Sequence, residues 1–560
     1  MSGARFRPRA DWLVPLFYCA FLLFFFAAPL GLLAVKSLTG ADGSLTLENY
    51  REFLRAPDLF ASLRNTLYLG VATVLLTVPL AFLLAYGIER TRIPLRGFFG
   101  HVGAASLLAP SLLPAMALVY LFGQQGLLKD LLGGHTIYGA PGLLLAETIA
   151  TFPHALVILR TALTAADGRL YEQAHLLGAG RWRTFFALTL PAARHGIVSA
   201  AFVVFSLAIA DVGAPKVVGG NFDVLALDIY KQVLGLQNFN LGAVVAILLL
   251  GPTVLAVLFE RWAARRQAAL RASRATPYAP DTNIGRDVAL FSACALIAIG
   301  IVGVLLVCQL AAIVKLWPYD MSWTLDHYRF DDFDGGGWDA VTDSVLLAAA
   351  TALAGTALVF GGGYVAERLK PLRWARALYS ALALAPAAVP GLALGLAYAL
   401  FFNDPANPLH VIYATFWILL IANVVHFFTV PHLTSISAIK ALDPEYEAAA
   451  QMSGRSIFSV FRAVALPLSA TALAEIALYL FVNAMTTVSV VVFLYPPAFK
   501  LAAVAVLNMD DAGDAAPAAA MGMMIVYVNL FARLAGALAT YCLRRRGGPA
   551  DVPVMEIAAV

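Results

Sequence analysis

The sequence predicts an all-α polytopic membrane protein of about twelve transmembrane helices, arranged as two parallel six-helix repeats. Three observations support this fold class. The 560 residues are 61% hydrophobic and only 13% charged, whereas soluble domains carry about 25% charged residues. The apolar residues gather into runs long enough to cross a bilayer, which takes about 20 residues of helix. A polar segment and several short motifs occur twice, once in each half of the chain.

Twelve apolar runs qualify as membrane spans, six in each half. The run at residues 12–35 is too long for the core of a signal peptide, so we count it as the first span. The predicted spans are residues 13–35, 63–88, 98–122, 140–163, 196–217, 241–262, 288–314, 341–366, 378–402, 409–433, 468–494 and 515–534.

The positive charges predict the orientation of these spans. With the N-terminus in the cytoplasm, most of the 38 Lys and Arg residues fall on the inner side, as the positive-inside rule requires. These inner residues include 5–9, 261–286 and 544–546, whereas the acidic residues in 331–343 and 510–514 fall outside. We therefore expect a multi-pass protein of the bacterial inner (cytoplasmic) membrane, with both termini in the cytoplasm.

Short motifs recur in the two halves, 276 or 278 positions apart. The matched motifs are Tyr86-x-x-Glu89-Arg90 with Tyr364-x-x-Glu367-Arg368, Pro110 and Pro114 with Pro386 and Pro390, and Pro153-His154 with Pro431-His432. Because each half holds six spans, the repeats have the same topology and are related by an axis along the membrane normal. A substrate path would follow that axis, between the halves.

The repeats set the predicted domain boundaries. We place the first repeat at residues 1–262, a cytoplasmic linker at 263–287 and the second repeat at 288–560. The linker holds few apolar residues and two prolines, Pro277 and Pro280, which is typical of a boundary.

The longest repeated element is a polar segment at residues 167–191, which returns at 443–467. Three residues of the first copy recur with the same spacing in the second: Asp167, Gly178 and Pro191 as Asp443, Gly454 and Pro467. The aspartates are placed as helix N-caps and the glycines end a short helix. Each copy therefore predicts a short amphipathic helix on the cytoplasmic surface. One copy could simply lie on lipid headgroups, but two matched copies favour docking of a partner.

Both polar segments resemble the EAA signature of permeases of type I binding-protein-dependent ABC importers. That signature reads Glu-Ala-Ala, three residues, Gly, nine residues, a hydrophobic residue, one residue and Leu-Pro. The matching residues are Glu172, Ala174, Gly178, Leu188, Leu190 and Pro191, and then Ala449, Ala450, Gly454, Val464, Leu466 and Pro467. The first copy departs at Gln173. In the second copy Ala448 stands at the Glu position, and Glu447 lies one residue earlier.

The resemblance implies that each segment is a coupling helix, which inserts into a groove on a separate ATPase. The coupling residues it implies are Glu172, Ala174, Gly178, Pro191, Glu447, Ala449, Ala450, Gly454 and Pro467. It also implies that a homodimeric ATPase binds ATP and Mg, that a periplasmic binding protein delivers a small solute, and that this chain binds no cofactor.

Residues after each signature narrow the resemblance. Residues 211–222 and 228–233 look like the fused permeases of the iron(III), thiamine and phosphonate group, and 485–489 with 506–514 look most like those of 2-aminoethylphosphonate importers. This resemblance implies 2-aminoethylphosphonate or a related phosphonate as the first choice of cargo. Iron(III), thiamine and polyamines stay open.

Polar residues inside or at the ends of spans are the candidates for a substrate path, because such groups are costly in a membrane. The candidates are Asp211, Asn483, Thr486, Thr487 and Ser489, and Thr487 is the repeat counterpart of Asp211. The hydroxyl and amide groups would suit an anionic cargo, and Asp211 would suit an ammonium group. The alternative is that Asp211 caps a broken helix or ends a span.

Three further intramembrane polar residues have two interpretations each. Asn423 and His426 fit an interhelical hydrogen bond as well as a ligand contact, and Glu147 is similarly ambiguous.

Several classes of function are not predicted. The sequence has no G-x-x-x-x-G-K-[ST] motif, which would hold a nucleotide phosphate. It has no Cys/His spacing typical of a metal site, no nucleophile–base constellation, and no charge excess that would indicate nucleic-acid binding. We therefore expect a non-catalytic subunit with ATP hydrolysis elsewhere. A secondary transporter driven by an ion gradient is the alternative, but it gives no reason for a repeated polar helix between spans.

Overall fold

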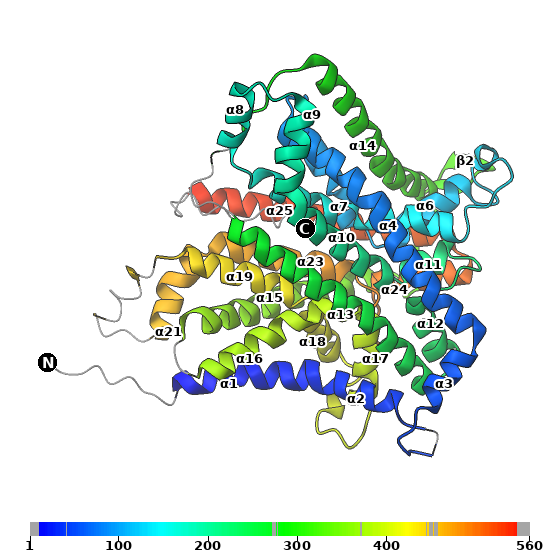
Figure 1. The fold of residues 1–560 in the computed structure, drawn as a ribbon. Helices are drawn as coiled ribbons and strands as arrows, with labels where there is room; N and C mark the ends of the chain where they lie inside the picture. Colours follow the sequence, from blue (N-terminus) through cyan, green and yellow to red (C-terminus); the bar gives the residue numbers. More distant parts are fainter. Residues whose placement is uncertain are drawn as a thin grey trace. The chain divides into compact units, whose positions relative to one another are not determined.

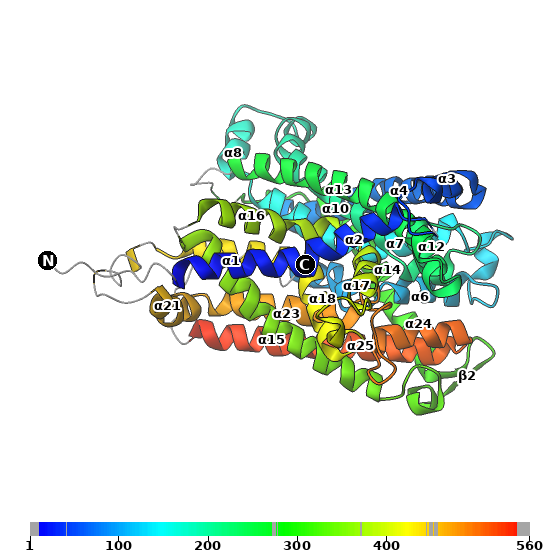
Figure 2. The same cartoon turned by 90° about the horizontal axis from the view of Figure 1, so that it is seen from below.

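The computed structural model describes residues 10–40, 42–270, 276, 278–369, 372–443, 445–446, 452 and 457–545. This part of the chain is almost entirely helical (Figures 1 and 2). Its one sheet, within the described ranges, pairs β1 (Val314–Leu316) with β2 (Asp320–Trp323) in antiparallel fashion.

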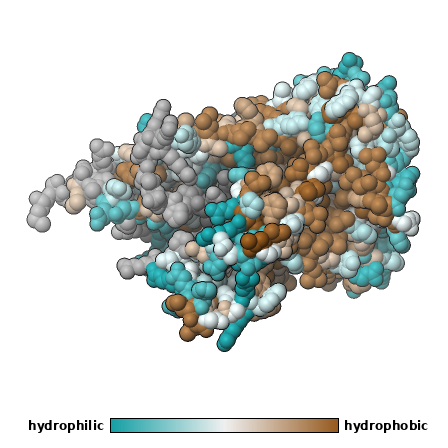
Figure 3. Space-filling model, turned by 90° about the horizontal axis from the view of Figure 1, so that it is seen from above, coloured by the Kyte–Doolittle hydropathy of each residue, from teal (hydrophilic) through white to brown (hydrophobic). Residues whose placement is uncertain are grey.

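Among the described residues, eight helices are long and apolar enough to cross a membrane. They are α1 (Ala10–Leu22) joined to α2 (Ala28–Ser37) through η1 (Leu23–Ala27), α4 (Pro57–Arg90), α7 (Ala140–Thr164), α9 (Arg181–Thr184) joined to α10 (Leu190–Ala210) through η4 (Phe185–Thr189), α13 (Phe239–Leu270), α14 (Ile284–Ile313), α15 (Asp339–Arg368) and α25 (Ala515–Arg545). Figure 3 shows hydrophobic residues over much of one face, as expected for helices that face lipid.

Four more pairs of helices pass the same test only together, because each pair is bent. The pairs are Arg96–Leu108 with Leu112–Phe122, bent by 99°, Arg373–Ala388 with Gly391–Phe402, by 113°, Phe416–His426 with Thr429–Ala441, by 59°, and Phe458–Leu468 with Ala470–Thr486, by 78°. If each pair counts as one span, the described chain has up to 12 spans. The prediction of about twelve transmembrane helices is confirmed.

The remaining elements are short. They are α3 (Glu48–Arg55), α5 (Arg96–Gly103), η2 (Ala105–Leu108), α6 (Leu112–Phe122), η3 (Lys129–Leu132), α8 (Gly168–Leu176), α11 (Gly213–Val218), α12 (Leu225–Tyr230), η5 (Lys231–Gly235), η6 (Asp326–Tyr328), η7 (Phe330–Asp332), α16 (Arg373–Leu384), η8 (Ala385–Ala388), α17 (Gly391–Phe402), η9 (His410–Ile412), α18 (Phe416–His426), α19 (Thr429–Ala441), α21 (Ile457–Val460), η10 (Phe461–Ala465), α22 (Leu466–Leu468), α23 (Ala470–Thr486) and α24 (Ala502–Ala512).

Two of the bends lie at prolines. Pro110 follows η2 and precedes α6, and Pro390 follows η8 and precedes α17. The residue before each proline is extended, Ala109 with ψ 143° and Val389 with ψ 116°, because a following proline disfavours the helical conformation. Pro110 and Pro390 are therefore structural counterparts. The predicted pairing of Pro110 with Pro386 is wrong, and so is that of Pro114, which lies inside α6, with Pro390.

Several predicted spans differ in their ends from the observed helices. The tenth was predicted at 409–433, whereas α18 begins at Phe416 and α19 continues to Ala441. The fifth was predicted to reach residue 217 and the eleventh residue 494, but α10 ends at Ala210 and α23 at Thr486. After α10 a break precedes the short helix α11, and after α23 the chain forms turns. Apolar composition alone does not separate such breaks and turns from a continued helix. Thr487 and Ser489 therefore lie beyond the helix, not inside a span.

The chain forms two compact units. Among the described residues, unit 1 comprises those within 10–45, 336–504 and 524–545, and unit 2 comprises those within 46–335 and 505–523. Unit 1 thus holds α1 and α2 together with helices of the second repeat. Unit 2 holds helices of the first repeat together with α14, most of α24 and the beginning of α25. This division by contacts differs from the division by sequence repeats, because the first span of each repeat packs with the other repeat.

Side chains of the exchanged helices show how they are held inside each unit. In unit 1, Cys19 of α1 donates a hydrogen bond from Sγ to the Ala375 carbonyl of α16 at 3.0 Å. In unit 2, Cys308 of α14 donates from Sγ to the Leu113 carbonyl of α6 at 3.4 Å. The core of unit 2 gathers buried residues of α4, α5, α7, α10 and α14.

Close packing explains the glycine run in α15. A Cβ atom at Gly363 would collide with the Ser435 side chain of α19. The run, Gly361 to Gly363, therefore lets two helices of unit 1 approach closely.

Candidate functional site

The first polar segment contains the helix that the sequence predicts. α8 runs from Gly168 to Leu176, and the Asp167 side chain caps it by accepting from the Arg169 amide at 3.1 Å. This hydrogen bond and those from Thr276 hold the pKa of Asp167 below its usual range. Figure 1 shows α8 next to α9.

A glycine ends α8. Gly178 has φ +71°, its amide donates to the His175 carbonyl, and the Ala179 amide donates to the Ala174 carbonyl, both at 2.9 Å. These two bonds form a Schellman motif, which requires a left-handed residue at this position. The spacing of the signature residues Ala174 and Gly178 thus produces a defined helix end.

The repeated prolines follow a π-turn in both halves. η4 (Phe185–Thr189) precedes Pro191, and η10 (Phe461–Ala465) precedes Pro467. Proline has no amide hydrogen and its ring clashes with the carbonyl four residues earlier, and a π-turn widens the helix at that point. The first helix therefore starts before its proline, at Arg181, and continues through it.

The repeated Glu-Arg motif fastens the helix that leads into each polar segment. Arg90 donates to the Leu163 carbonyl of α7 at 2.6 Å, and Arg368 donates to the Ile439 and Leu442 carbonyls, at the end of α19, at 2.7 and 2.8 Å. Cations are favourable at helix C-termini, where carbonyls lack partners. The sequence identifies this motif as repeated but does not reveal this role.

The neighbouring glutamates pair with the same helices. Glu89 forms an ion pair with Arg160 of α7 at 2.8 Å, and Glu367 forms one with Lys440 of α19 at 3.4 Å. Each polar segment is thus anchored by two adjacent side chains of the second span of its repeat.

Large apolar side chains stand exposed at matching places in both polar segments. The pairs, each 276 positions apart, are Leu170 (51% exposed) with Tyr446 (52%), Leu176 (84%) with Met452 (85%), and Trp182 (77%) with Phe458 (55%). A Cβ atom built at Gly178 would meet nothing within 4 Å. Grouped exposed apolar side chains indicate an interaction surface. We call Leu170, Leu176 and Trp182 the first docking surface, and Tyr446, Met452 and Phe458 the second.

The structure places some of the implied coupling residues. Glu172, Gly178, Pro191 and Pro467 are exposed, and Ala174 is half-buried. Glu447, Ala449, Ala450 and Gly454 lie outside the described residues. Sequence reasoning missed Trp182 and Phe458, although their equal spacing from the repeated glycines was available as a signal.

Asp211 caps a helix, which is one of the two roles the sequence left open. Its Oδ1 accepts from the Ser111 hydroxyl at 2.6 Å, and its Oδ2 accepts from the Ala214 amide of α11 at 2.9 Å. Glu147, buried in α7, contacts the same carboxyl group. Unit 2 therefore contains a compact polar cluster at the break between α10 and α11.

The other substrate-path candidates belong to unit 1. Asn483 donates to the Tyr479 carbonyl at 2.8 Å and Thr486 to the Val482 carbonyl at 3.1 Å, both within α23. Thr487 is the C-cap of α23, and Ser489 lies against Gly391 of α17. The convergence of these residues with Asp211 on one path stays a prediction.

The predicted interhelical hydrogen bond of Asn423 is not formed with any residue that the structure describes. Both polar atoms of its side chain are buried without a partner there, as is Nδ1 of His426. The side chain of Asn423 is fully buried in unit 1. Within the described part of the chain, no polar group from a neighbouring helix accepts or donates a hydrogen bond to it, although buried polar groups usually have such a partner.

Taken together, two repeats of membrane-spanning helices, each interrupted by a polar segment whose described apolar side chains are exposed, are typical of a membrane permease. The chain belongs to the family described as binding-protein-dependent transport system inner membrane component, which matches residues 78–269 and 358–539. It is therefore a fused permease subunit of the ABC importer class, with one copy of the family's fold in each repeat.

Individual relatives carry several different names. The chain is 26% identical to the ferric transport system permease protein FbpB of Actinobacillus pleuropneumoniae over 83% of its own length and 69% of that protein. It is 24% identical to the putative 2-aminoethylphosphonate transport system permease protein PhnU of Salmonella typhimurium over 43% of its length and 87% of that protein. A solved bacterial alginate ABC transporter, in complex with alginate pentasaccharide-bound periplasmic protein, matches 48% of the chain and 98% of its own chain at 16% identity and a TM-score of 0.40.

Proposed function

We propose that this permease carries a small solute inward through the membrane, and that a separate homodimeric ATPase drives it by docking on the first and second docking surfaces. The observation that supports this proposal is the matched exposure of apolar side chains in the two repeats, shown by Leu176 and Met452 at 84% and 85%. Two matched sets of exposed side chains suit a partner that offers the same groove twice, which is what a symmetric dimer provides.

The anchoring of each loop gives this docking a mechanical consequence. Movement of the first docking surface would reach α4 through Arg90 and Glu89, because these side chains hold the end of α7. Movement of the second would reach α15 through Arg368. Closure of the ATPase on ATP and Mg would draw the two surfaces together and switch the permease between outward and inward opening.

The distribution of charge supports a cytoplasmic location for both docking surfaces. Arg181 stands next to Trp182 of the first, Arg183 and Arg194 follow that surface, and Arg462 follows the second. Basic residues near span ends favour the cytoplasmic side. The N- and C-termini would lie on the same side.

Ferric ion and 2-aminoethylphosphonate are equally well supported as the cargo of this permease. A relative named for ferric transport matches most of the chain, whereas a relative named for 2-aminoethylphosphonate matches less than half of it at a similar identity. The resemblance of residues 485–489 and 506–514 favours the phosphonate, and thiamine and polyamines stay further candidates. A periplasmic binding protein would select among them.

Replacement of the exposed apolar side chains tests the docking. We expect Leu176→Ser and Met452→Ser together to weaken ATPase binding by about tenfold or more, because each exposed leucine-sized side chain is worth on the order of 1–2 kcal/mol when buried. The affinity of the purified ATPase for the permease in lipid nanodiscs measures this. Leu131→Ser is the matched control, since Leu131 is 75% exposed in a different loop. Unchanged ATPase affinity in the double variant would refute the docking proposal.

The cargo needs a separate measurement. Calorimetric titration of the binding protein with ferric ion, 2-aminoethylphosphonate and thiamine, followed by uptake of the tighter ligand into proteoliposomes, decides between them. Uptake by the permease without its ATPase, driven by a proton gradient, would contradict the ATP-driven mechanism.

A further inference from the structure

The linker between the repeats contacts the base of α8. Gly168, the first residue of α8, donates its amide to the Thr276 carbonyl at 2.9 Å. Thr276 donates in return to Asp167 Oδ1, from its hydroxyl at 3.0 Å and from its amide at 3.3 Å. Thr276 of the linker thus forms three hydrogen bonds with the start of α8, one with Gly168 and two with Asp167, the residue that caps the helix.

A second linker residue packs on α8 through an arginine. The guanidinium carbon of Arg90 lies 4.6 Å from the ring centroid of Tyr171, on α8, and 4.6 Å from that of Tyr278, in the linker. The two tyrosine rings also contact each other, with centroids 4.7 Å apart. A cation that lies close to two aromatic rings is attracted by both. Arg90, Tyr171 and Tyr278 therefore form a three-membered cluster, which we call the tyrosine–arginine cluster.

The tyrosine–arginine cluster stabilises Arg90, whose charge is buried. Arg90 is 3% exposed, and within the described chain its Nε and Nη1 atoms have no hydrogen-bond partner. A buried charge is costly unless other groups compensate it. The Leu163 carbonyl compensates Nη2, and the tyrosine rings supply the remaining attraction. Without the Tyr278 ring, Arg90 would lose half of its aromatic contact and be opened to water.

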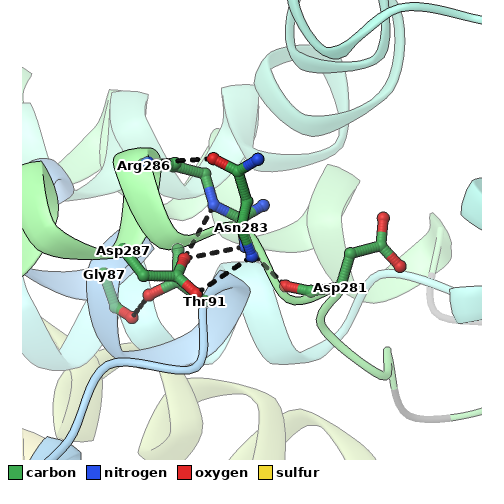
Figure 4. Close-up of polar contacts among 6 residues, drawn as sticks. All are labelled: Gly87, Thr91, Asp281, Asn283, Arg286 and Asp287. Carbon is green, nitrogen blue, oxygen red and sulfur yellow. Dashed lines mark hydrogen bonds and ion pairs between the residues drawn. The ribbon is translucent and has the colours of Figure 1, made fainter.

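The linker is also fixed beyond Tyr278 (Figure 4). Asn283 caps α14 by accepting from the Arg286 amide at 2.9 Å. Arg286 donates to the Asp281 carbonyl at 2.7 Å and forms an ion pair with Asp287 at 2.9 Å. α14 packs against α4, since a Cβ atom at Gly87 would collide with Cys294. Tyr278 therefore lies between two anchored points and is not part of a free connection.

We propose that Thr276 and Tyr278 are positioning residues for the first coupling helix, α8. The linker thus holds the helix that carries the first docking surface in place, in addition to connecting the repeats. This proposal rests on the proposed ATPase docking for its functional consequence, but the positioning itself does not depend on it. The chain has one such linker, and position 447, the counterpart of Tyr171, is Glu447. A contact between a linker and a tyrosine is therefore expected for the first coupling helix and not for its counterpart.

Hydrogen exchange on the full-length permease in nanodiscs tests the positioning without any ATPase. We expect Tyr278→Ala to speed amide exchange in Gly168–Leu176 by about twofold to thirtyfold, the range that corresponds to one lost cation–ring contact. Tyr278→Phe keeps the ring and should exchange as the unchanged protein does. Thr276→Val is a milder second variant, which removes one hydroxyl donor. Tyr319→Ala is the matched control, because Tyr319 is an exposed tyrosine in a different loop.

Transport per ATP hydrolysed, measured with the ATPase and binding protein in proteoliposomes, then tests the consequence. We expect Tyr278→Ala to lower this ratio by about twofold or more, and Tyr278→Phe to restore it. Unchanged exchange in α8 would overturn the positioning proposal, whatever the transport result. Equally fast exchange in Tyr278→Phe would overturn the role of the ring.

Faster exchange with an unchanged transport ratio would overturn the role in coupling. The ATPase affinity of the Leu176→Ser and Met452→Ser variant, measured alongside, separates that result from failure of the docking proposal itself. The exchange of α15 amides in the same samples reports whether a variant has lost its fold.

Discussion

Substitution of Gly178 separates the cost of backbone strain from the cost of blocked docking. Gly178 has φ +71°, and a Cβ atom there would meet nothing within 4 Å. Gly178→Ala and Gly178→Trp therefore carry the same internal cost, that of a left-handed non-glycine residue, about 1–2 kcal/mol. The tryptophan ring adds bulk only toward the outside of the molecule.

The difference in ATPase affinity between the two variants shows whether a partner protein packs against Gly178. If an ATPase groove surrounds the end of α8, the larger side chain prevents close approach of the ATPase. Because overpacking costs about 1–3 kcal/mol, we expect Gly178→Trp to bind the ATPase at least about fivefold more weakly than Gly178→Ala. Affinity of the purified ATPase for each variant in nanodiscs provides the measurement.

A matched glycine controls for general effects of a new tryptophan. Gly133 also has a left-handed conformation, φ +57°, and open space around a Cβ atom, but it follows η3 in a different loop. Gly133→Trp should leave ATPase affinity unchanged. Equal affinities of Gly178→Ala and Gly178→Trp would refute the reasoning, because bulk at this position would then touch no partner.

Three further outcomes are expected. Glu172→Ala should lower transport per ATP less than Gly178→Trp does, because Glu172 is exposed and its counterpart in the second repeat is Ala448; an equal or larger loss would contradict this order. Arg368→Ala should destabilise the end of α19 by about 2–3 kcal/mol, since it removes two charge-assisted hydrogen bonds, and faster exchange of the last α19 amides, with Arg368→Lys as an intermediate control, would show it. Asp228 lies in α12, outside the candidate spans, and burial raises its pKa to about 6. The polar and charged groups around its carboxyl group are those of Ser62, Asp223, Lys231 and Asp58. Because the folded pKa lies above the unfolded one, protonation stabilises the fold, so the melting temperature should rise as pH falls from 7 toward 4; Asp228→Asn should abolish this rise and stabilise the protein at pH 7 by on the order of 2 kcal/mol. A pH dependence that persists in Asp228→Asn would assign it to another group.

Local signals in the sequence were enough to locate α8. Asp167 and Gly178 define its two ends through hydrogen bonds that span only a few residues, so the capping rules apply without knowledge of the fold. The same holds for the number of spans, because the length of an apolar run reports directly on the thickness of a bilayer.

Where a span bends or ends could not be predicted from local sequence signals. The apolar residues after Thr486 form turns, although the hydropathy predicts a continued helix to residue 494. The 113° bend at Pro390 lies inside a run that the sequence treats as one span. Apolar composition shows that a segment avoids water, but not whether it is straight, since buried turns and helices have similar hydropathy.

The sequence by itself determined the twofold repeat, the number of spans, the position of α8 and the class of transporter, because these depend on periodicity, spacing and composition along the chain. Only the tertiary structure decided the exchange of the first span between repeats, the role of the Glu-Arg motif and the contact of the linker with α8. Arg90, Tyr171 and Tyr278 are up to 188 positions apart. No local pattern couples them, because their attraction arises only after folding has removed water from around Arg90 and brought both rings against it.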